Sequence, residues 1–163
     1  MGMRVWLSQR EQARRHGRGT LADLLGEREQ TVGMGGIGRS VPELSDVDVI
    51  WYLRSKVAFL FEVEWTAILG GPLLRRHPRI GADEKLIRFL AVAPERTDLI
   101  RHKLERSPLL RAAMDEYGWH IIKWDHLRTF LAAEKPDLDD LEPLLGLDPF
   151  VERSGDQMPL FGG

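Results

Sequence analysis

Two β-prone runs in residues 46–66 constrain the fold of this chain more than any other feature. Each run is rich in β-branched and aromatic residues, neither is long enough for an independent helix, and the polar triplet Arg54-Ser55-Lys56 separates them. This pattern predicts a β-hairpin. If the triplet is a three-residue loop, Leu53 lies opposite Val57, and that pair sets the register of the two strands.

Four carboxylates occupy the far end of this predicted hairpin. In the same register, Asp48 lies opposite Glu62 and Asp46 lies opposite Glu64. Because opposed residues share a face of the sheet and side chains alternate with a period of two, all four are expected to converge on one face. A slip of one residue would move the glutamates to the other face.

Carboxylates packed this closely repel one another and raise one another's pKa, so a chain that keeps such a cluster is expected to use it. Hard oxygen ligands suit Mg²⁺ or Mn²⁺. We therefore predict a metal site with Asp48, Glu62 and Glu64 as the main ligands and Asp46 as a weaker one. The alternative is that Asp46 lies in a loop and the glutamates pair with arginines.

The hairpin resembles the core of the PD-(D/E)xK nuclease superfamily, which has the restriction-endonuclease-like fold. In that family an acid at the start of one strand precedes an acid-x-Lys motif on the next, and Asp48 and the run Glu62-Val63-Glu64 match this arrangement. Glu64 stands where the pattern has lysine, although some restriction enzymes of this fold carry Glu-x-Glu there. The resemblance implies that Asp48, Glu62 and a backbone carbonyl near Val63 hold the metal. It also implies that Glu64 binds a second ion or orients the attacking water.

The rest of the chain is predicted to alternate strands and helices. The predicted strands cover about 3–7, 85–94 and 119–124, and the predicted helices cover about 8–16, 20–29, 66–76 with a break at 70–72, 97–106, 107–117, 127–133 and 137–145. Strands separated by helices imply parallel crossovers beside the antiparallel hairpin. The expected fold is therefore α/β, a mixed central sheet with flanking helices, and the resemblance covers about residues 20–133.

Composition limits the classes of protein to consider. The length of 163 residues, 43% of them apolar, suits one domain, expected over 1–148 with a flexible tail over 149–163. The absence of cysteine excludes a disulfide scaffold and thiolate metal sites. A net charge of −2 gives no general basic signal, so nucleic-acid contacts must rest on local patches. No apolar run is long enough to span a membrane and no signal-peptide pattern is present, so a cytoplasmic protein without membrane contact is expected.

The densest basic cluster follows the hairpin and contains Arg75, Arg76, His77 and Arg79. Because it lies close in sequence to Glu64, its three arginines are predicted to contact nucleic-acid phosphates. The alternative is an exposed basic face. Arg75 or Arg76 is also a candidate to replace the missing lysine electrostatically.

Two segments before the hairpin have candidate roles. The nuclease fold usually has a helix there that lends a glutamate to the site, and Glu27 and Glu29 are the candidates, with solvated glutamates as the alternative. The run 33–38 matches G-x-G-x-x-G by spacing, but Pro42 follows too soon for a helix. We therefore predict a flexible loop that leads into the hairpin and not a dinucleotide site.

The C-terminal tail carries a second resemblance. Gln157, Leu160 and Phe161 match the bacterial sliding-clamp-binding pentapeptide, Gln-x-x-Leu-Phe. The resemblance implies that a clamp recruits the protein to DNA, with the two apolar side chains in a pocket and the glutamine setting the register by hydrogen bonds. The alternative is that Leu160 and Phe161 fold back onto the domain.

These features together predict a Mg²⁺- or Mn²⁺-dependent DNA endonuclease that acts in restriction or repair. One alternative is a catalytically inactive module with the nuclease fold that binds DNA or docks in a DNA modification or repair complex. Another is a nuclease that acts on RNA. The sequence leaves the oligomeric state open, with a homodimer among the alternatives.

Overall fold

The computed structural model describes residues 4–25, 42–53, 56–66, 68–80 and 86–134. Five strands form one sheet in the order β1-β4-β5-β6-β7. Their bounds are β1 Arg4–Leu7, β4 Val49–Leu53, β5 Lys56–Glu64, β6 Ile87–Val92 and β7 Trp119–Lys123. Neighbours β1, β4 and β5 are antiparallel, whereas β5, β6 and β7 are parallel. The predicted fold class, a mixed α/β sheet with an antiparallel hairpin and flanking helices, is confirmed.

The β4–β5 hairpin differs from the predicted register next to its turn and agrees with it further along the strands. Leu53 pairs with Lys56, so the predicted three-residue loop and the pairing of Leu53 with Val57 are wrong. The register then shifts between Trp51 and Tyr52, because β5 contains one more residue than β4 over this stretch. Beyond that bulge, Trp51 pairs with Phe59, which is the register predicted for the half of the hairpin away from the turn.

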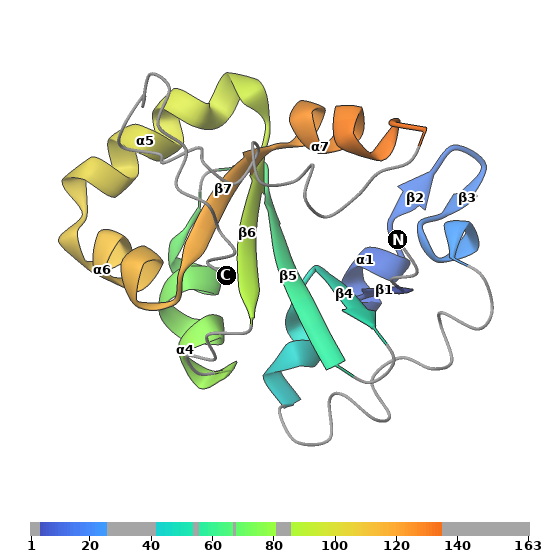
Figure 1. The fold of residues 1–163 in the computed structure, drawn as a ribbon, viewed down its shortest axis with the longest axis horizontal. Helices are drawn as coiled ribbons and strands as arrows, with labels where there is room; N and C mark the ends of the chain where they lie inside the picture. The colour runs from blue at the N-terminus through green and yellow to red at the C-terminus, as the bar shows by residue number, and fades with distance from the viewer. Residues whose placement is uncertain (1–3, 26–41, 54–55, 67, 81–85, 135–163) are drawn as a thin grey trace.

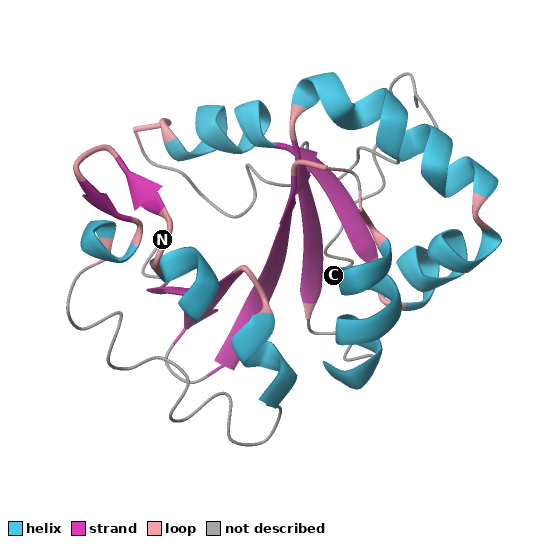
Figure 2. Cartoon of the chain, turned by 180° about the vertical axis from the view of Figure 1, so that it is seen from behind, coloured by secondary structure: helices cyan, strands magenta, loops and turns pink. Residues whose placement is uncertain are grey.

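Helical crossovers connect the parallel strands. Their bounds are η3 Pro72–Arg76, a π-helical turn, then α4 His77–Ile80, η4 Pro94–Arg96, α5 Thr97–Arg106 and α6 Pro108–Glu116. Figure 1 shows α5 and α6 at one side of the sheet. Figure 2 shows the molecule from behind, and in that view α4 lies on the viewer's side of the strands. The helix predicted for 66–76 instead starts at Gly70 and continues to Ile80, with Pro72 in its first turn, where proline is well tolerated.

The two faces of the sheet have separate cores. One face carries Leu60, Leu90 and Ile121, which lie under η3, α5 and α6 and under the 3-10 helix η2, Pro42–Asp46. The other face is aromatic: Phe61 stacks on Phe89 with ring centroids 4.9 Å apart. Phe130 of α7, Trp124–Leu131, packs against this aromatic face.

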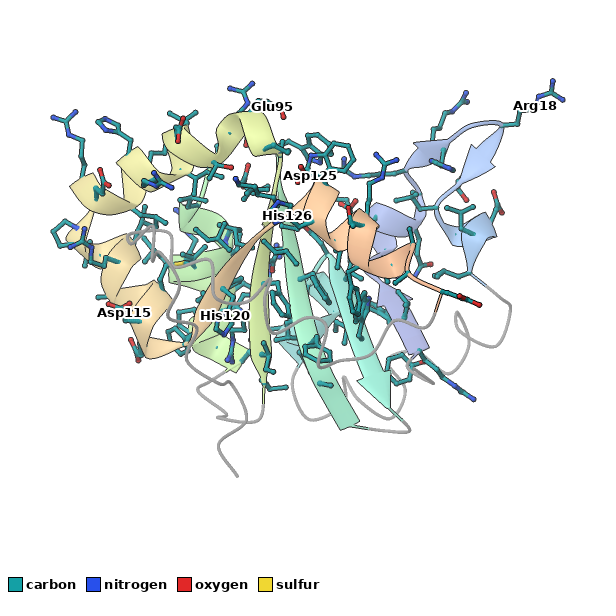
Figure 3. All side chains as sticks on the ribbon, turned by 45° about the horizontal axis from the view of Figure 1, so that its top comes forward. Arg18, Glu95, Asp115, His120, Asp125 and His126 are labelled. Atoms are coloured by element: carbon teal, nitrogen blue, oxygen red, sulfur yellow. The ribbon has the colours of Figure 1, made fainter. Side chains whose placement is uncertain are left out.

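Helix α7 starts earlier than the sequence pattern predicts. It begins directly after β7, at Trp124 and not at Leu127. In Figure 1, α7 and α5 both begin at the upper end of β6 and β7, and Figure 3 shows Asp125 and His126 at that end of α7. The carboxyl ends of the three parallel strands are therefore gathered where two helices begin.

The N-terminal segment departs most from the prediction. The helix that Ser8 and Glu11 start, α1, covers only Gln9–Gln12, and the chain then forms the small hairpin of β2, Arg15–His16, and β3, Gly19–Thr20. The stretch predicted as a helix from residue 20 contains only the 3-10 turn η1, Ala22–Leu24, within the described part. Gly17 has a φ of 58°, a left-handed conformation that favours a turn over a continued helix.

Candidate functional site

A cavity of about 440 Å³ opens where β5 ends, between α1 and the η3 turn. Its polar lining includes Arg10, Asp48, Glu62, Glu64 and Arg76. Three of the four carboxylates predicted to gather thus line one cavity. They do so because Leu60, Glu62 and Glu64 alternate onto the same face of β5, as the period of a strand requires.

Asp48 is buried, with 3% of its surface exposed, immediately before β4 begins. Its Oδ2 accepts a hydrogen bond from the backbone N–H of Val63 at 2.9 Å, and its other oxygen accepts one from the Arg10 guanidinium. The backbone carbonyl of Asp48 accepts from the N–H of Ser8 at 3.1 Å. The carboxylate is therefore held between the β1–α1 junction and β5.

Glu62 is equally buried, with 2% of its surface exposed. Nη1 of Arg76 lies 2.6 Å from both of its carboxylate oxygens, and Nε2 of His77 lies 2.9 Å from Oε1. Arg76 comes from η3 and His77 from the start of α4. The helix after the hairpin thus supplies both partners of the central acid.

His77 is fully buried and connects Glu62 to a second buried arginine. Nε of Arg88, a residue of β6 with 1% of its surface exposed, lies 3.3 Å from His77 Nδ1. An arginine N–H only donates, so Nδ1 accepts and the imidazole proton sits on Nε2, where it is donated to Glu62. Trp119 packs against the imidazole with ring centroids 4.4 Å apart.

The protonation equilibria of this pair are shifted in opposite directions. Burial, with the nearby Asp48 carboxylate, raises the pKa of Glu62 to about 8 against the opposing effect of Arg76. Burial, with the charges of Arg88 and Arg76, lowers the pKa of His77 to about 3. The neutral imidazole expected from its hydrogen bonds agrees with this lowered value.

Of the other two predicted acids, Glu64 lines the same cavity as Asp48 and Glu62, whereas Asp46 does not. Glu64 lines the cavity, and its Oε1 accepts from the N–H of Thr66 at 2.6 Å and from the Thr66 hydroxyl at 2.7 Å. Asp46 is exposed at the end of η2 and lines a neighbouring cavity of about 490 Å³, to which Arg10 and Arg76 also contribute. Asp46 therefore does not face Glu64, because η2 delays the start of β4 to Val49.

A fourth buried carboxylate near the site was not predicted. Glu11 of α1 has 7% of its surface exposed and pairs with Arg14 at 2.6 Å and with Arg10 at 3.1 Å. Since Arg10 also binds Asp48, it bridges the two acids. The capping-box spacing of Ser8 and Glu11 was the available signal, and the Ser8 hydroxyl does accept from the Glu11 N–H at 3.3 Å.

The predicted phosphate-binding arginines separate into two groups. Arg75 and Arg79 are exposed, whereas Arg76 is largely buried against Glu62. The candidates Glu27, Glu29, Gln157, Leu160 and Phe161 lie outside the described residues.

The chain matches no protein-family model, no curated protein and no solved structure. None of the helices in the described ranges is long and apolar enough to cross a lipid bilayer.

The carboxylates that line the cavity are the candidate ligands of a divalent ion. Within the described ranges, no three His, Asp, Glu or Cys side chains lie close enough together to hold a metal ion by themselves. Mg²⁺ is usually bound by only one or two carboxylates and keeps several waters. Asp48 and Glu62, two buried carboxylates in one open cavity, meet that smaller requirement.

Proposed function

We propose that this chain is a Mg²⁺- or Mn²⁺-dependent deoxyribonuclease with a restriction-endonuclease-like fold. The observation that carries the proposal is the position of Asp48 and Glu62. Asp48 lies immediately before β4 and Glu62 lies on β5, so the two buried carboxylates come from one antiparallel hairpin, and both line one cavity. Burying two like charges together is costly unless cations offset them, so the pair favours a role in binding a cation.

The order of the elements supports the same proposal. Asp48 directly precedes the first strand of an antiparallel pair, and Glu62-Val63-Glu64 ends the second. A helix follows, and the next strand returns parallel to β5. This is the arrangement that the resemblance to the PD-(D/E)xK superfamily leads one to expect.

In this proposal Asp48 and Glu62 hold the metal ion. When bound, such an ion supplies an activated water and offsets negative charge on the phosphate. The surrounding residues keep the two carboxylates in place: Val63 donates its N–H to Asp48, and His77 donates Nε2–H to Glu62. Arg10 and Arg76, which now neutralise the carboxylates, are placed to contact a phosphate that enters the cavity.

Arg76 also supplies a positive charge where Glu64 replaces the lysine of the family pattern. The family pattern has lysine where this chain has Glu64, and a cation is therefore missing from that position on the strand. The Arg76 guanidinium lies 2.6 Å from Glu62 Oε1 and lines the same cavity. We assign to Arg76 the electrostatic part of the absent lysine's role.

The alternative is a catalytically inactive module that binds DNA. One observation favours it: each of the two central carboxylates already has a guanidinium partner, Arg10 for Asp48 and Arg76 for Glu62. In that case the cluster is a structural ion-pair network, and divalent cations do not bind there.

Calorimetric titration with Mn²⁺ and cleavage of supercoiled plasmid in Mg²⁺ or Mn²⁺ distinguish the two functions. The variants are Asp48→Asn and Glu62→Gln. The control is Asp115→Asn, an exposed acid on α6 at the opposite side of the molecule from α1 (Figure 3). The nuclease proposal expects wild-type and control protein to bind Mn²⁺ and cut DNA, and each site variant to lose at least 100-fold in rate.

A folded wild-type protein that neither binds Mn²⁺ nor cuts the plasmid would instead support the inactive module. A single-stranded RNA substrate in the same assay tests whether the activity is directed at RNA.

A further inference from the structure

Two large apolar side chains remain exposed at the cavity that holds the acids. Trp65, the residue after β5, has 52% of its surface exposed, and Ile68 has 67%. Both line the same cavity as Asp48 and Glu62. Single apolar residues on a surface are ordinary, but an exposed indole and an exposed isoleucine at the rim of a charged cavity indicate a ligand with an apolar face.

The Trp65 ring is held in place by α7. Its centroid lies 6.3 Å from that of Trp124, the first residue of α7, with 45° between the ring planes. The Arg128 guanidinium lies over Trp124 at 5.0 Å from the ring centroid. Figure 1 shows why these segments meet: α7 begins at the end of the sheet where the parallel strands finish. Trp65 is therefore supported on one side while half of its surface faces water.

Cations flank the same opening. Arg10 and Arg14 line the cavity, and 62% and 53% of their side-chain surfaces are exposed. A guanidinium has five N–H donors, so Arg14, which pairs with one carboxylate, and Arg10, which pairs with two, can each still donate to a phosphate. The opening thus presents an aromatic ring and positive charges to the same ligand, the combination that binds single-stranded nucleic acid.

We infer that the cavity takes an unpaired DNA strand, with one base stacked on Trp65 and its phosphate beside Arg10 and Arg14. In a duplex the faces of a base are covered by its neighbours, so a free face exists only in an unpaired, terminal or flipped nucleotide. The carboxylates lie 2–3% exposed in the cavity, so a phosphate must enter it to reach them. This inference deepens the proposed function, since it names the substrate class of the same site.

The test measures binding separately from cleavage. Fluorescence anisotropy in EDTA compares a labelled single-stranded oligonucleotide with the same sequence as a blunt duplex. Trp65→Leu keeps apolar bulk beside Trp124 but removes the flat ring, and Trp65→Phe keeps a stacking surface. Leu109→Ala, at a residue with 72% of its surface exposed on α6, is the matched control.

We expect wild-type protein to bind the single strand more tightly than the duplex. Trp65→Leu should weaken single-strand binding by about 5- to 100-fold, the effect of losing one stacked base, whereas Trp65→Phe and Leu109→Ala stay within about threefold. Equal affinity for the two DNA forms, an unchanged affinity of Trp65→Leu, or no binding at all overturns the inference. If no DNA binds, the exposed Trp65 and Ile68 would instead indicate contact with a protein partner.

The two proposals can fail separately. Cleavage of plasmid without any preference for unpaired DNA keeps the proposed function and removes this inference. Binding of single strands that depends on Trp65, without cleavage in any metal ion, keeps this inference and removes the nuclease.

Discussion

At the scale of single residues, the site is a short chain of buried hydrogen bonds. Arg88 donates to His77, His77 donates to Glu62, and Arg76 pairs with the same carboxylate. Glu62, His77 and Arg88 are buried, and Arg76 is mostly buried. Buried polar groups need hydrogen-bond partners, and these side chains supply them to one another. A change in one member should therefore alter the behaviour of the others.

Glu62 and His77 together predict how stability depends on pH without metal. The native pKa of Glu62, about 8, exceeds its ordinary 4.5, so the free energy of unfolding falls as pH rises through that interval. The native pKa of His77, about 3, lies below its ordinary 6.5, so the free energy of unfolding rises from pH 3 to 6.5. The two effects oppose each other between pH 4.5 and 6.5.

We therefore expect a broad maximum of stability between pH 4.5 and 6.5. Above it, the free energy of unfolding should fall by on the order of 2 kcal/mol up to pH 8. Glu62→Gln should abolish this fall and leave a rise up to pH 6.5 from His77 alone. Urea unfolding in EDTA at a series of pH values measures this, and parallel curves for wild type and variant would contradict it.

Arg88 predicts a large stability effect from a residue outside the cavity lining. Besides His77, Arg88 donates to the Tyr117 carbonyl at 3.1 Å. Arg88 also donates to the Leu86 carbonyl at 3.4 Å, so Arg88→Met removes three hydrogen bonds and leaves the buried His77 Nδ1 without its donor. The free energy of unfolding should therefore decrease by about 2–4 kcal/mol. The exposed Arg79→Met is the control and should stay within about 0.5 kcal/mol. Equal denaturation midpoints for the two variants would show that the Arg88 network contributes nothing.

At the scale of elements, the lengths of strands and helices follow local signals where those signals are strong. Ser107 caps α6, with its hydroxyl accepting from the Leu110 N–H at 3.4 Å, and Pro108 begins the helix. Gly118 ends the connection with a φ of 58° before β7 starts. These local devices explain why the helices predicted over 97–106 and 107–117 agree with α5 and α6.

Gly118 provides a prediction at this scale. A side chain in the left-handed region costs about 1–2 kcal/mol, so Gly118→Ala should lower the free energy of unfolding by that amount even though space is available for a Cβ. Gly70→Ala is the matched control, because it also meets open space but lies at the start of a helix. It should be neutral or stabilise by about 0.5 kcal/mol. Thermal unfolding that ranks the two variants the other way would contradict this assignment.

At the scale of the whole molecule, the sheet brings together segments that are far apart in the chain. The β1–α1 junction, the β4–β5 hairpin and η3 surround the cavity, and Trp124 of α7 contacts Trp65, which lines it. The arrangement places the candidate site at the carboxyl ends of the parallel strands, where α/β sheets commonly bind ligands.

The tail supplies the prediction at this scale. A labelled peptide of residues 153–163 is expected to bind a bacterial sliding clamp through Gln157, Leu160 and Phe161. Replacing Leu160 and Phe161 with alanine should weaken binding by at least tenfold, because both apolar anchors are lost. Equal binding of the two peptides, or none at high micromolar clamp, would favour the alternative that these residues contact their own domain.

The sequence alone determined the register that pairs Val49 with Phe61 in the hairpin and the alternation of strands and helices. It could do so because strand alternation, caps and turn residues act over a few positions, and only one register puts both apolar faces of the hairpin into cores. Only the tertiary structure determined which arginines pair with the acids and with His77. Arg10 and Asp48 are 38 positions apart, and Arg88 and His77 are 11 apart on different elements. No local pattern encodes such contacts, because burial and charge pairing depend on how the elements pack.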